Sequence, residues 1–433
     1  MLNYRNGLAD MPSYDVVERP WEIKINANEC NMSLPPLVEE RVMNRLGTVA
    51  FNRYPNEQYD DLRDQIARNF SMQRENVLIG SGSSEIIEKL FYCFGGSPEA
   101  KIVYPQPSFS MYKIYAKAAE ATGVPVDLDP EDYSLDIDKF IQTVNEEKAT
   151  LAVICNPNNP TGNAFTVEEI EKIASNIDCA FLVDEAYMEF YGQTAVRLLA
   201  KYPNMIIART FSKAYGLASC RVGYMLADAK IVEMIDKSYM PYHMNVLSLV
   251  TADICYQMRQ EFVPHIQIMI SERKRMLEEL KKLPGVKVFP SETNFILVHY
   301  DKAQELNALF ESKGIGVRHF GDAPGLRLFG VVQFFKLPSL EAWRVLDAPV
   351  VFLFQRRFCL KAGQPLLQRL IIRFPLFCRN IKSIYKPLQR PIVSPFGRGK
   401  HKIQGFSLFY RKIAVLVQII QQILVMAPCN SLS

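Results

Sequence analysis

One lysine lies in a segment whose composition suits covalent chemistry. Lys213 occurs in the run Thr210-Phe-Ser-Lys-Ala-Tyr-Gly216, and Arg221 follows shortly after. A lysine removed from water loses its proton more readily, and the neutral amine can attack a carbonyl carbon. Thr210, Ser212 and Arg221 could hold a phosphate dianion beside it. A single lysine is most often a solvated surface charge, but the spacing of these four residues argues against that interpretation.

A carboxylate follows an apolar run. Asp184 comes directly after Ala180-Phe-Leu-Val183, and Tyr187 lies three residues further on. A carboxylate at the end of a buried strand is costly unless a cation pairs with it. A protonated pyridine nitrogen is such a cation, and the pairing makes the ring a stronger electron sink. Tyr187 could hydrogen-bond a ring oxygen, whereas a helix-capping aspartate is the alternative interpretation.

Three further motifs follow apolar runs. Gly80–Glu85 precedes a helical pattern, where free N–H groups and the helix dipole can bind an anion, although a plain helix cap is the alternative. Pro105–Tyr112 contains Phe109, which could lie against a planar ring or simply belong to the core. Cys155–Gly162 predicts a tight turn, in which the Asn159 amide could donate to a phenolate oxygen.

The elements that must position these motifs alternate between about residues 75 and 230. Helices are predicted over 84–94 and 167–176, with apolar residues on one face. Apolar runs typical of buried parallel strands cover residues 76–79, 101–104, 151–155, 180–183, 204–208 and 222–226. This alternation predicts an α/β sheet with helices on both faces. Ligands bind at the carboxyl ends of the strands in such sheets, so we expect the motifs to meet there.

A smaller second domain is predicted beyond this sheet. Residues 227–285 have a helical pattern, strands are expected at 285–289 and 294–298, and a helix at 304–313. The predicted division is an N-terminal segment (1–40) that contributes to the small domain and a dimer, a large cofactor-binding domain (41–285), an incomplete small domain (286–330) and an aberrant basic and apolar tail (331–433).

The tail differs in composition from the rest of the chain. From residue 346 onward there are 14 lysines and arginines and a single acid, Asp347, whereas residues 1–345 carry a net charge of −9. Soluble surfaces normally mix both signs of charge. Residues 413–427 are apolar but shorter than the roughly 20 residues of a membrane span. We therefore expect a shifted reading frame near residue 325 rather than a membrane anchor.

The composition also indicates the cellular compartment and the classes of binding partner to expect. Of the 433 residues, 48% are hydrophobic and 22% are charged, as in globular proteins. The nine cysteines lack CxxC spacing, and the N-terminus lacks a signal-peptide pattern, which favours a reducing, cytoplasmic location. The mildly acidic body gives no reason to expect nucleic acid, and no metal site is predicted.

Together these motifs resemble the class I/II aminotransferases of the aspartate aminotransferase fold, over about residues 15–327, and most closely their histidinol-phosphate aminotransferase family. The resemblance implies the type I fold of transferases that depend on pyridoxal 5′-phosphate, with Lys213 as the catalytic, Schiff-base lysine. Asp184 would pair with the pyridine nitrogen, and Asn159 and Tyr187 would contact the ring O3′. Phe109 would stack on the ring. The phosphate would be surrounded by Gly82, Ser83, Ser84, Thr210, Ser212 and Arg221.

The resemblance also implies substrates and an assembly. Asn28, in Asn26-Ala-Asn-Glu29, would lie near the substrate. Tyr54, in Arg53-Tyr-Pro55, would reach the phosphate of a neighbouring subunit, which implies a homodimer with shared active sites. The amino donor would be histidinol phosphate, and 2-oxoglutarate would return the cofactor to its starting form.

The sequence departs from the family near the end of the resemblance. The family continues to a strand with an arginine that grips the substrate's charged end, usually followed by a Gly-Thr turn. This chain has Arg327 in Pro324-Gly-Leu-Arg-Leu-Phe-Gly330, without the surrounding pattern. Three alternatives therefore stay open: an aromatic aminotransferase, an amino-acid-phosphate decarboxylase, or a cofactor-binding protein with impaired catalysis.

Overall fold

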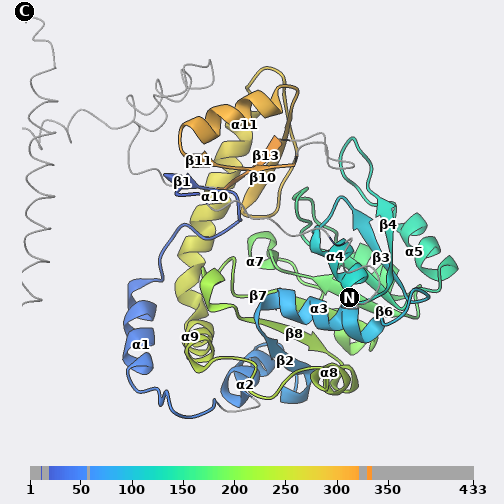
Figure 1. Cartoon of the computed structure of the whole chain (residues 1–433), viewed down its shortest axis with the longest axis vertical. Coiled ribbons are helices and arrows are strands. Elements are labelled where there is room, and N and C mark those ends of the chain that lie inside the picture. The colour runs from blue at the N-terminus through green and yellow to red at the C-terminus, as the bar shows by residue number, and fades with distance from the viewer. Residues whose placement is uncertain (1–10, 12–18, 56–58, 321–328, 334–433) are drawn as a thin grey trace, which may run out of the picture. The chain divides into compact units, whose positions relative to one another are not determined.

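The computed structural model describes residue 11 and residues 19–55, 59–320 and 329–333. A seven-stranded sheet with the order β2-β8-β7-β6-β5-β3-β4 forms the centre of the large domain (Figure 1). Its strands are β2 (Val77–Gly80), β3 (Lys101–Gln106), β4 (Thr122–Asp127), β5 (Leu151–Cys155), β6 (Ala180–Asp184), β7 (Met205–Thr210) and β8 (Gly223–Ala227). The predicted α/β fold with a mainly parallel sheet is confirmed.

Two strands differ from the sequence-based expectation. The prediction that residues 222–226 run parallel to their neighbours is wrong, because β8 pairs antiparallel with both β2 and β7. The loop that contains Lys213 joins β7 to β8 and returns the chain at the same edge of the sheet, without a crossover. Strand β4 was not predicted because Gly123 and Pro125 interrupt its pattern, which an edge strand tolerates.

Helices cover both faces of this sheet. One face packs against α3 (Gly82–Phe94), α4 (Met111–Ala118) and α8 (Ala229–Asp236). The other face packs against α2 (Asp60–Asn69), α5 (Ile137–Glu146), α6 (Val167–Ala174) and α9 (Val246–Gln257). Successive residues of β5 enter the two cores alternately, with Val153 on the first side and Ile154 on the second. The unbroken apolar runs follow from this burial on both sides.

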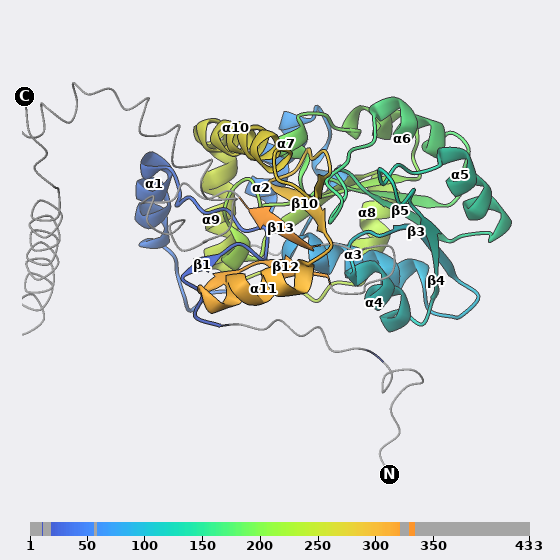
Figure 2. The ribbon, with the colours of Figure 1, turned by 90° about the horizontal axis from the view of Figure 1, so that it is seen from above.

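Helix α10 (Val263–Leu280) leads from the large domain to the small one, as Figures 1 and 2 show. The small domain has an antiparallel sheet of order β12-β13-β10-β9. Its elements are β9 (Val286–Val288), β10 (Phe295–Tyr300), α11 (Ala303–Ser312), β11 (Ile315–Gly316), β12 (Arg318–His319) and β13 (Phe329–Gln333). Strand β13 spans the boundary predicted at residue 330, and the rest of the predicted tail, 334–433, lies outside the described residues.

The N-terminal segment lies against both domains. Strand β1 (Ile23–Lys24) pairs in parallel with β11, and α1 (Pro36–Leu46) packs on α9. The predicted helical stretch 227–285 contains α8, α9 and α10, but residues 237–245 and 281–285 are not helical. None of the described helices combines the length and the apolar composition that a bilayer crossing requires.

Close backbone packing joins β8 to the start of α3. A Cβ atom added at Gly223 would lie 2.3 Å from the Ser83 amide nitrogen and 2.5 Å from the Gly82 carbonyl carbon. Gly82 itself has φ +77°, and a Cβ atom there would lie 2.6 Å from Nη2 of Arg221. Glycine at both positions therefore lets the strand, the helix N-terminus and the arginine come together.

We expect Gly223→Ala to displace the first turn of α3, because backbone atoms cannot move aside as a flexible side chain can. Urea unfolding should show a loss of about 1–3 kcal/mol, as for overpacked core sites. Gly47→Ala is the matched control, since a Cβ atom there meets its nearest neighbour at 3.5 Å. Equal stability of the two variants would contradict this account of the contact.

Candidate active site

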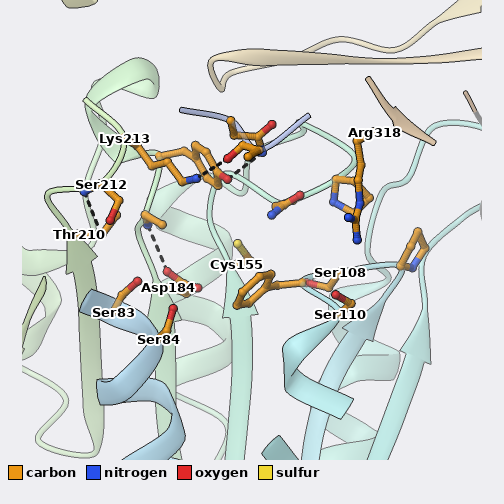
Figure 3. A pocket seen from close by; sticks show the side chains of 18 of the residues that line it. Ser83, Ser84, Ser108, Ser110, Cys155, Asp184, Thr210, Ser212, Lys213 and Arg318 are labelled. Atoms are coloured by element: carbon orange, nitrogen blue, oxygen red, sulfur yellow. Dashed lines mark hydrogen bonds between the residues drawn. The ribbon is translucent and has the colours of Figure 1, made fainter. Parts of the chain in front are cut away.

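A cavity of about 570 Å³ opens at the carboxyl ends of β3, β5, β6 and β7. Figure 3 shows its side chains converging from the large-domain strands, from the start of α3, and from β12 of the small domain. The predicted site residues that line it are Asn28, Ser83, Ser84, Phe109, Asn159, Asp184, Tyr187, Thr210, Ser212, Lys213 and Arg221. The sheet thus brings together residues that are almost 200 positions apart in the sequence.

Lys213 extends into this cavity from the β7–β8 loop (Figure 3). Its side chain is half-buried, and Nζ donates a hydrogen bond to the Ala27 carbonyl oxygen at 3.1 Å. Nζ also lies 5.7 Å from the centre of the Tyr187 ring. Burial lowers the pKa of Lys213 to about 8. A substantial fraction of the amine is therefore neutral near pH 8, as a nucleophile or a general base requires.

Asp184 occupies the floor of the cavity at the end of β6. It is 3% exposed, and burial raises its pKa to about 6. Two donors oppose this effect: the Tyr112 hydroxyl donates to Oδ2 at 2.9 Å, and the Ala186 amide donates to Oδ1 at 3.2 Å. The carboxylate thus retains its charge near neutral pH and favours a cationic ligand group above it.

An anion-binding cluster lies beside these two residues. Ser83 and Ser84 belong to the first turn of α3, where backbone N–H groups are free of intrahelical partners. Arg221 donates from Nη1 to Ser212 Oγ at 3.3 Å, and the Ser212 amide donates to Thr210 Oγ1 at 3.1 Å. Hydroxyls, a helix N-terminus and a guanidinium are the groups that bind a phosphate dianion.

The remaining predicted contacts form the walls of the cavity. Phe109 packs edge-on against Tyr112, with ring centres 5.5 Å apart. The Tyr187 hydroxyl accepts a hydrogen bond from Asn28 Nδ2 at 3.0 Å. Asn28 adopts φ +53°, and its carbonyl oxygen accepts from Asn294 Nδ2 at 3.2 Å. The N-terminal segment is therefore tied both to the cavity and to the small domain.

Two predicted site residues do not line the cavity, and a third lies outside the described residues. Gly82 does not line the cavity, although it adjoins Arg221. Tyr54 is 80% exposed, does not line the cavity, and stacks on Tyr242 with ring centres 4.6 Å apart. Arg327 lies outside the described residues. The predicted roles of Tyr54 and Arg327 therefore stay predictions.

Sequence reasoning missed several residues at the site. Tyr112, the partner of Asp184, was assigned no role because nothing in a linear pattern links two side chains 72 positions apart. Lys113 and Arg318 line the cavity and add two cations to it, together with the aromatic Phe320. Arg318 directly follows the strand-like pattern at residues 315–317. A cation at the end of a predicted strand was the signal by which the sequence could have identified it.

A buried ion pair lies immediately behind the site. Arg209 donates to Glu185 Oε2 from Nε at 3.0 Å and from Nη2 at 2.7 Å, and both side chains are almost fully buried. Glu185 also accepts from the Thr194 hydroxyl and the Ala195 amide. Burial alone would lower the pKa of Arg209, but Tyr224, Glu185 and Glu189 raise it, so the guanidinium stays charged.

The comparisons with known proteins agree with this geometry. The family model "Aminotransferase class I and II" matches residues 22–328, so the chain belongs to that family, whose members are enzymes dependent on pyridoxal 5′-phosphate. The predicted class of enzyme is thus confirmed.

The individual relatives are more specific. A histidinol-phosphate aminotransferase of Thermoanaerobacter sp. is 38% identical over 74% of this chain and 91% of its own length. One of Clostridium novyi is 35% identical over 74% and 89%. Among solved structures, histidinol-phosphate aminotransferase from Sinorhizobium meliloti, in complex with pyridoxal 5′-phosphate, has a TM-score of 0.69 at 24% identity, covering 78% of this chain and 92% of that one.

The residues present fit this cofactor. Asp184 is a buried carboxylate that lacks a cationic hydrogen-bond partner among the described residues, and a pyridinium N–H would supply one. The serine, threonine and arginine cluster suits the 5′-phosphate, and Lys213 suits the aldehyde. Asn159 and Tyr187 lie on the cavity wall, where they can contact the ring oxygen.

Removing the charge of Glu185 should destabilise the fold, because Arg209 would remain buried without its hydrogen-bonded counter-charge. We expect Glu185→Gln to cost about 3–5 kcal/mol in urea unfolding, the loss typical of a broken buried pair. Glu168→Gln removes the partner of Arg197 in an exposed pair and should cost about 0–1 kcal/mol. The double variant Glu185→Leu/Arg209→Met should regain much of the loss. A Glu185→Gln protein as stable as the wild type would refute the role of the pair.

Proposed function

We propose that this chain is a pyridoxal-phosphate-dependent histidinol-phosphate:2-oxoglutarate aminotransferase of histidine biosynthesis. The observation that carries the proposal is the convergence of Lys213, Asp184 and the Thr210–Ser212–Arg221 cluster in one cavity. Relatives named histidinol-phosphate aminotransferase, 35–38% identical over about three quarters of the chain, support the choice of amino donor.

The side chains divide the work of the reaction. The bound cofactor supplies an electron sink for the bond broken at the substrate's Cα. Asp184, charged near neutral pH, would hold the ring nitrogen in its protonated state. Lys213 Nζ would accept the proton of the substrate's Cα as a general base and would return a proton as a general acid. Asn28 holds the Tyr187 hydroxyl in position, and Phe109, on the cavity wall, would cover the ring.

The far side of the cavity supports a substrate that carries an anionic group away from its amine. Arg318 approaches from β12, across the cavity from Lys213 (Figure 3), and Lys113 lines the same cavity from α4. The Arg318 guanidinium carbon lies 6.0 Å from the centre of the Phe320 ring. A phosphorylated aliphatic amine that carries an aromatic ring, as histidinol phosphate does, matches two cations and an adjacent ring.

Two rival substrates use the same scaffold. L-threonine-O-3-phosphate decarboxylase from Porphyromonas gingivalis has a TM-score of 0.65 at 20% identity, which shows a shared fold alone. An aromatic amino acid carries a single carboxylate charge for the two cations Lys113 and Arg318, whereas a phosphate dianion matches both of them. We favour histidinol phosphate over both rivals because relatives that are 35–38% identical carry that name.

We further propose a cytoplasmic homodimer with shared active sites. Support comes from apolar side chains that are exposed along the N-terminal segment: Leu37 and Met43 of α1, then Phe51 and Tyr54. Four such residues within 18 positions form a surface that a second copy of the chain would cover. Tyr54 would then approach the phosphate site of that copy.

We also propose that the chain leaves its ancestral reading frame near residue 325. The family match ends at residue 328, and acids almost disappear beyond that point. Translating the gene in its other two frames past codon 325 should reveal an arginine strand followed by a Gly-Thr turn. If the tail is instead a genuine extension, whose basic residues could bind an acidic surface, no other frame will contain this pattern.

The substrate proposal predicts a clear order of activities. Purified protein with pyridoxal phosphate should transfer the amino group of histidinol phosphate to 2-oxoglutarate, with phenylalanine a much poorer donor. Arg318→Met should raise KM for histidinol phosphate about tenfold or more, the loss expected for a charge-assisted hydrogen bond.

Three outcomes would contradict parts of this proposal. A preference for phenylalanine would overturn the proposed amino donor. A wild type that binds the cofactor without turnover would favour the impaired alternative, and cofactor absorbance that survives in Lys213→Ala would overturn the role of Lys213.

A further inference from the structure

The carboxylate at the floor of the cavity accepts a hydrogen bond from a buried tyrosine. Tyr112, on the first turn of α4, is fully buried, and its hydroxyl donates to Asp184 Oδ2 at 2.9 Å. The other carboxylate oxygen accepts from the Ala186 backbone amide. Within the part of the chain that the structure describes, each oxygen of Asp184 therefore has one donor, and the donor to Oδ2 is the one from a side chain.

The surroundings of Tyr112 hold its hydroxyl in place. Its ring stacks on Phe91 with centres 6.0 Å apart, meets Phe109 edge-on at 5.5 Å, and lies 6.1 Å from Tyr104. The backbone amide of Tyr112 donates to the Phe109 carbonyl oxygen at 3.0 Å. Aromatic side chains packed on several sides have little rotamer freedom, so the hydroxyl is preorganised toward the carboxylate.

We propose that Tyr112 is a positioning residue that orients Asp184 and keeps it ionised for the ring nitrogen of the cofactor, an inference that rests on the proposed function. Burial holds the pKa of Tyr112 well above its ordinary value, so the proton of this hydrogen bond stays on the phenol. Donation to the carboxylate opposes the burial that raises the pKa of Asp184. Lys213 also favours the ionised carboxylate, whereas Glu185 disfavours it.

The consequence is a defined pH dependence of cofactor affinity. The ring nitrogen pairs with ionised Asp184, so affinity for pyridoxal phosphate falls as the pH drops through the pKa of this group in the cofactor-free protein, about 6. Loss of the Tyr112 hydroxyl raises that pKa, because the charged form loses a donor. The decline in affinity must then begin at a higher pH.

The test is a titration of cofactor-free full-length protein with pyridoxal phosphate from pH 5 to pH 9, followed by absorbance. Tyr112→Phe and wild type should have Kd values within about twofold at pH 9, and should differ by about tenfold or more below pH 6, the effect of one hydrogen bond to a charged group. Tyr256→Phe is the matched control, since it removes a hydroxyl from another buried tyrosine, outside the cavity. Its curve should follow the wild type.

A second variant separates this role from a merely structural one. In an Asp184→Asn background there is no carboxylate to titrate, so Tyr112→Phe should no longer change the pH dependence. A Tyr112→Phe curve that superimposes on the wild type, or an effect that persists in Asp184→Asn, would overturn the inference. A wild type that binds no cofactor at any pH would instead overturn the proposed function.

Discussion

The site depends on one electrostatic problem: a carboxylate buried at the end of a β-strand. Asp184 is 3% exposed and has lost most of its hydration. Among the described residues, one hydroxyl and one backbone amide donate hydrogen bonds to the carboxylate, and no cationic side chain does. A site in this state favours a ligand that brings a positive charge to it. The need for a cationic ring nitrogen is thus built into the fold.

The alternation of side chains along the strands also places an ion pair behind the cavity. Successive side chains of a strand point to opposite faces. Asp184 and Thr210 face the cavity from β6 and β7, while their sequence neighbours Glu185 and Arg209 meet behind the sheet. The Glu185 amide also bonds to the Ala208 carbonyl oxygen. A buried ion pair is by itself weak evidence for stability, but this one joins the ends of the two strands that present the carboxylate and part of the phosphate cluster.

The sequence revealed the parts of the site whose motifs lie at strand ends. Lys213, Asp184 and Asn159 each follow an unbroken apolar run, and parallel strands bring such positions to one edge of the sheet. Tyr112 could not be found in this way, because its partner is distant in sequence and its own surroundings are typical of a core aromatic. The antiparallel direction of β8 could not be predicted from the sequence either, because burial on both faces produces the same apolar run in either orientation.

The small domain shows why the sheet and the recognition of the substrate differ in how much sequence change they tolerate. Strand β13 joins the sheet between β12 and β10 through backbone hydrogen bonds, which most residue types can form. The sheet can therefore extend across the point where the family match ends at residue 328. Recognition of a substrate anion tolerates fewer substitutions, because it requires a cation at a particular place. Arg318 lies before the break and lines the cavity, whereas the arginine expected after it has no family pattern around it. The large domain supplies the residues that suit the cofactor, and under the proposed function donor selection falls on Arg318 and Lys113, which line the cavity.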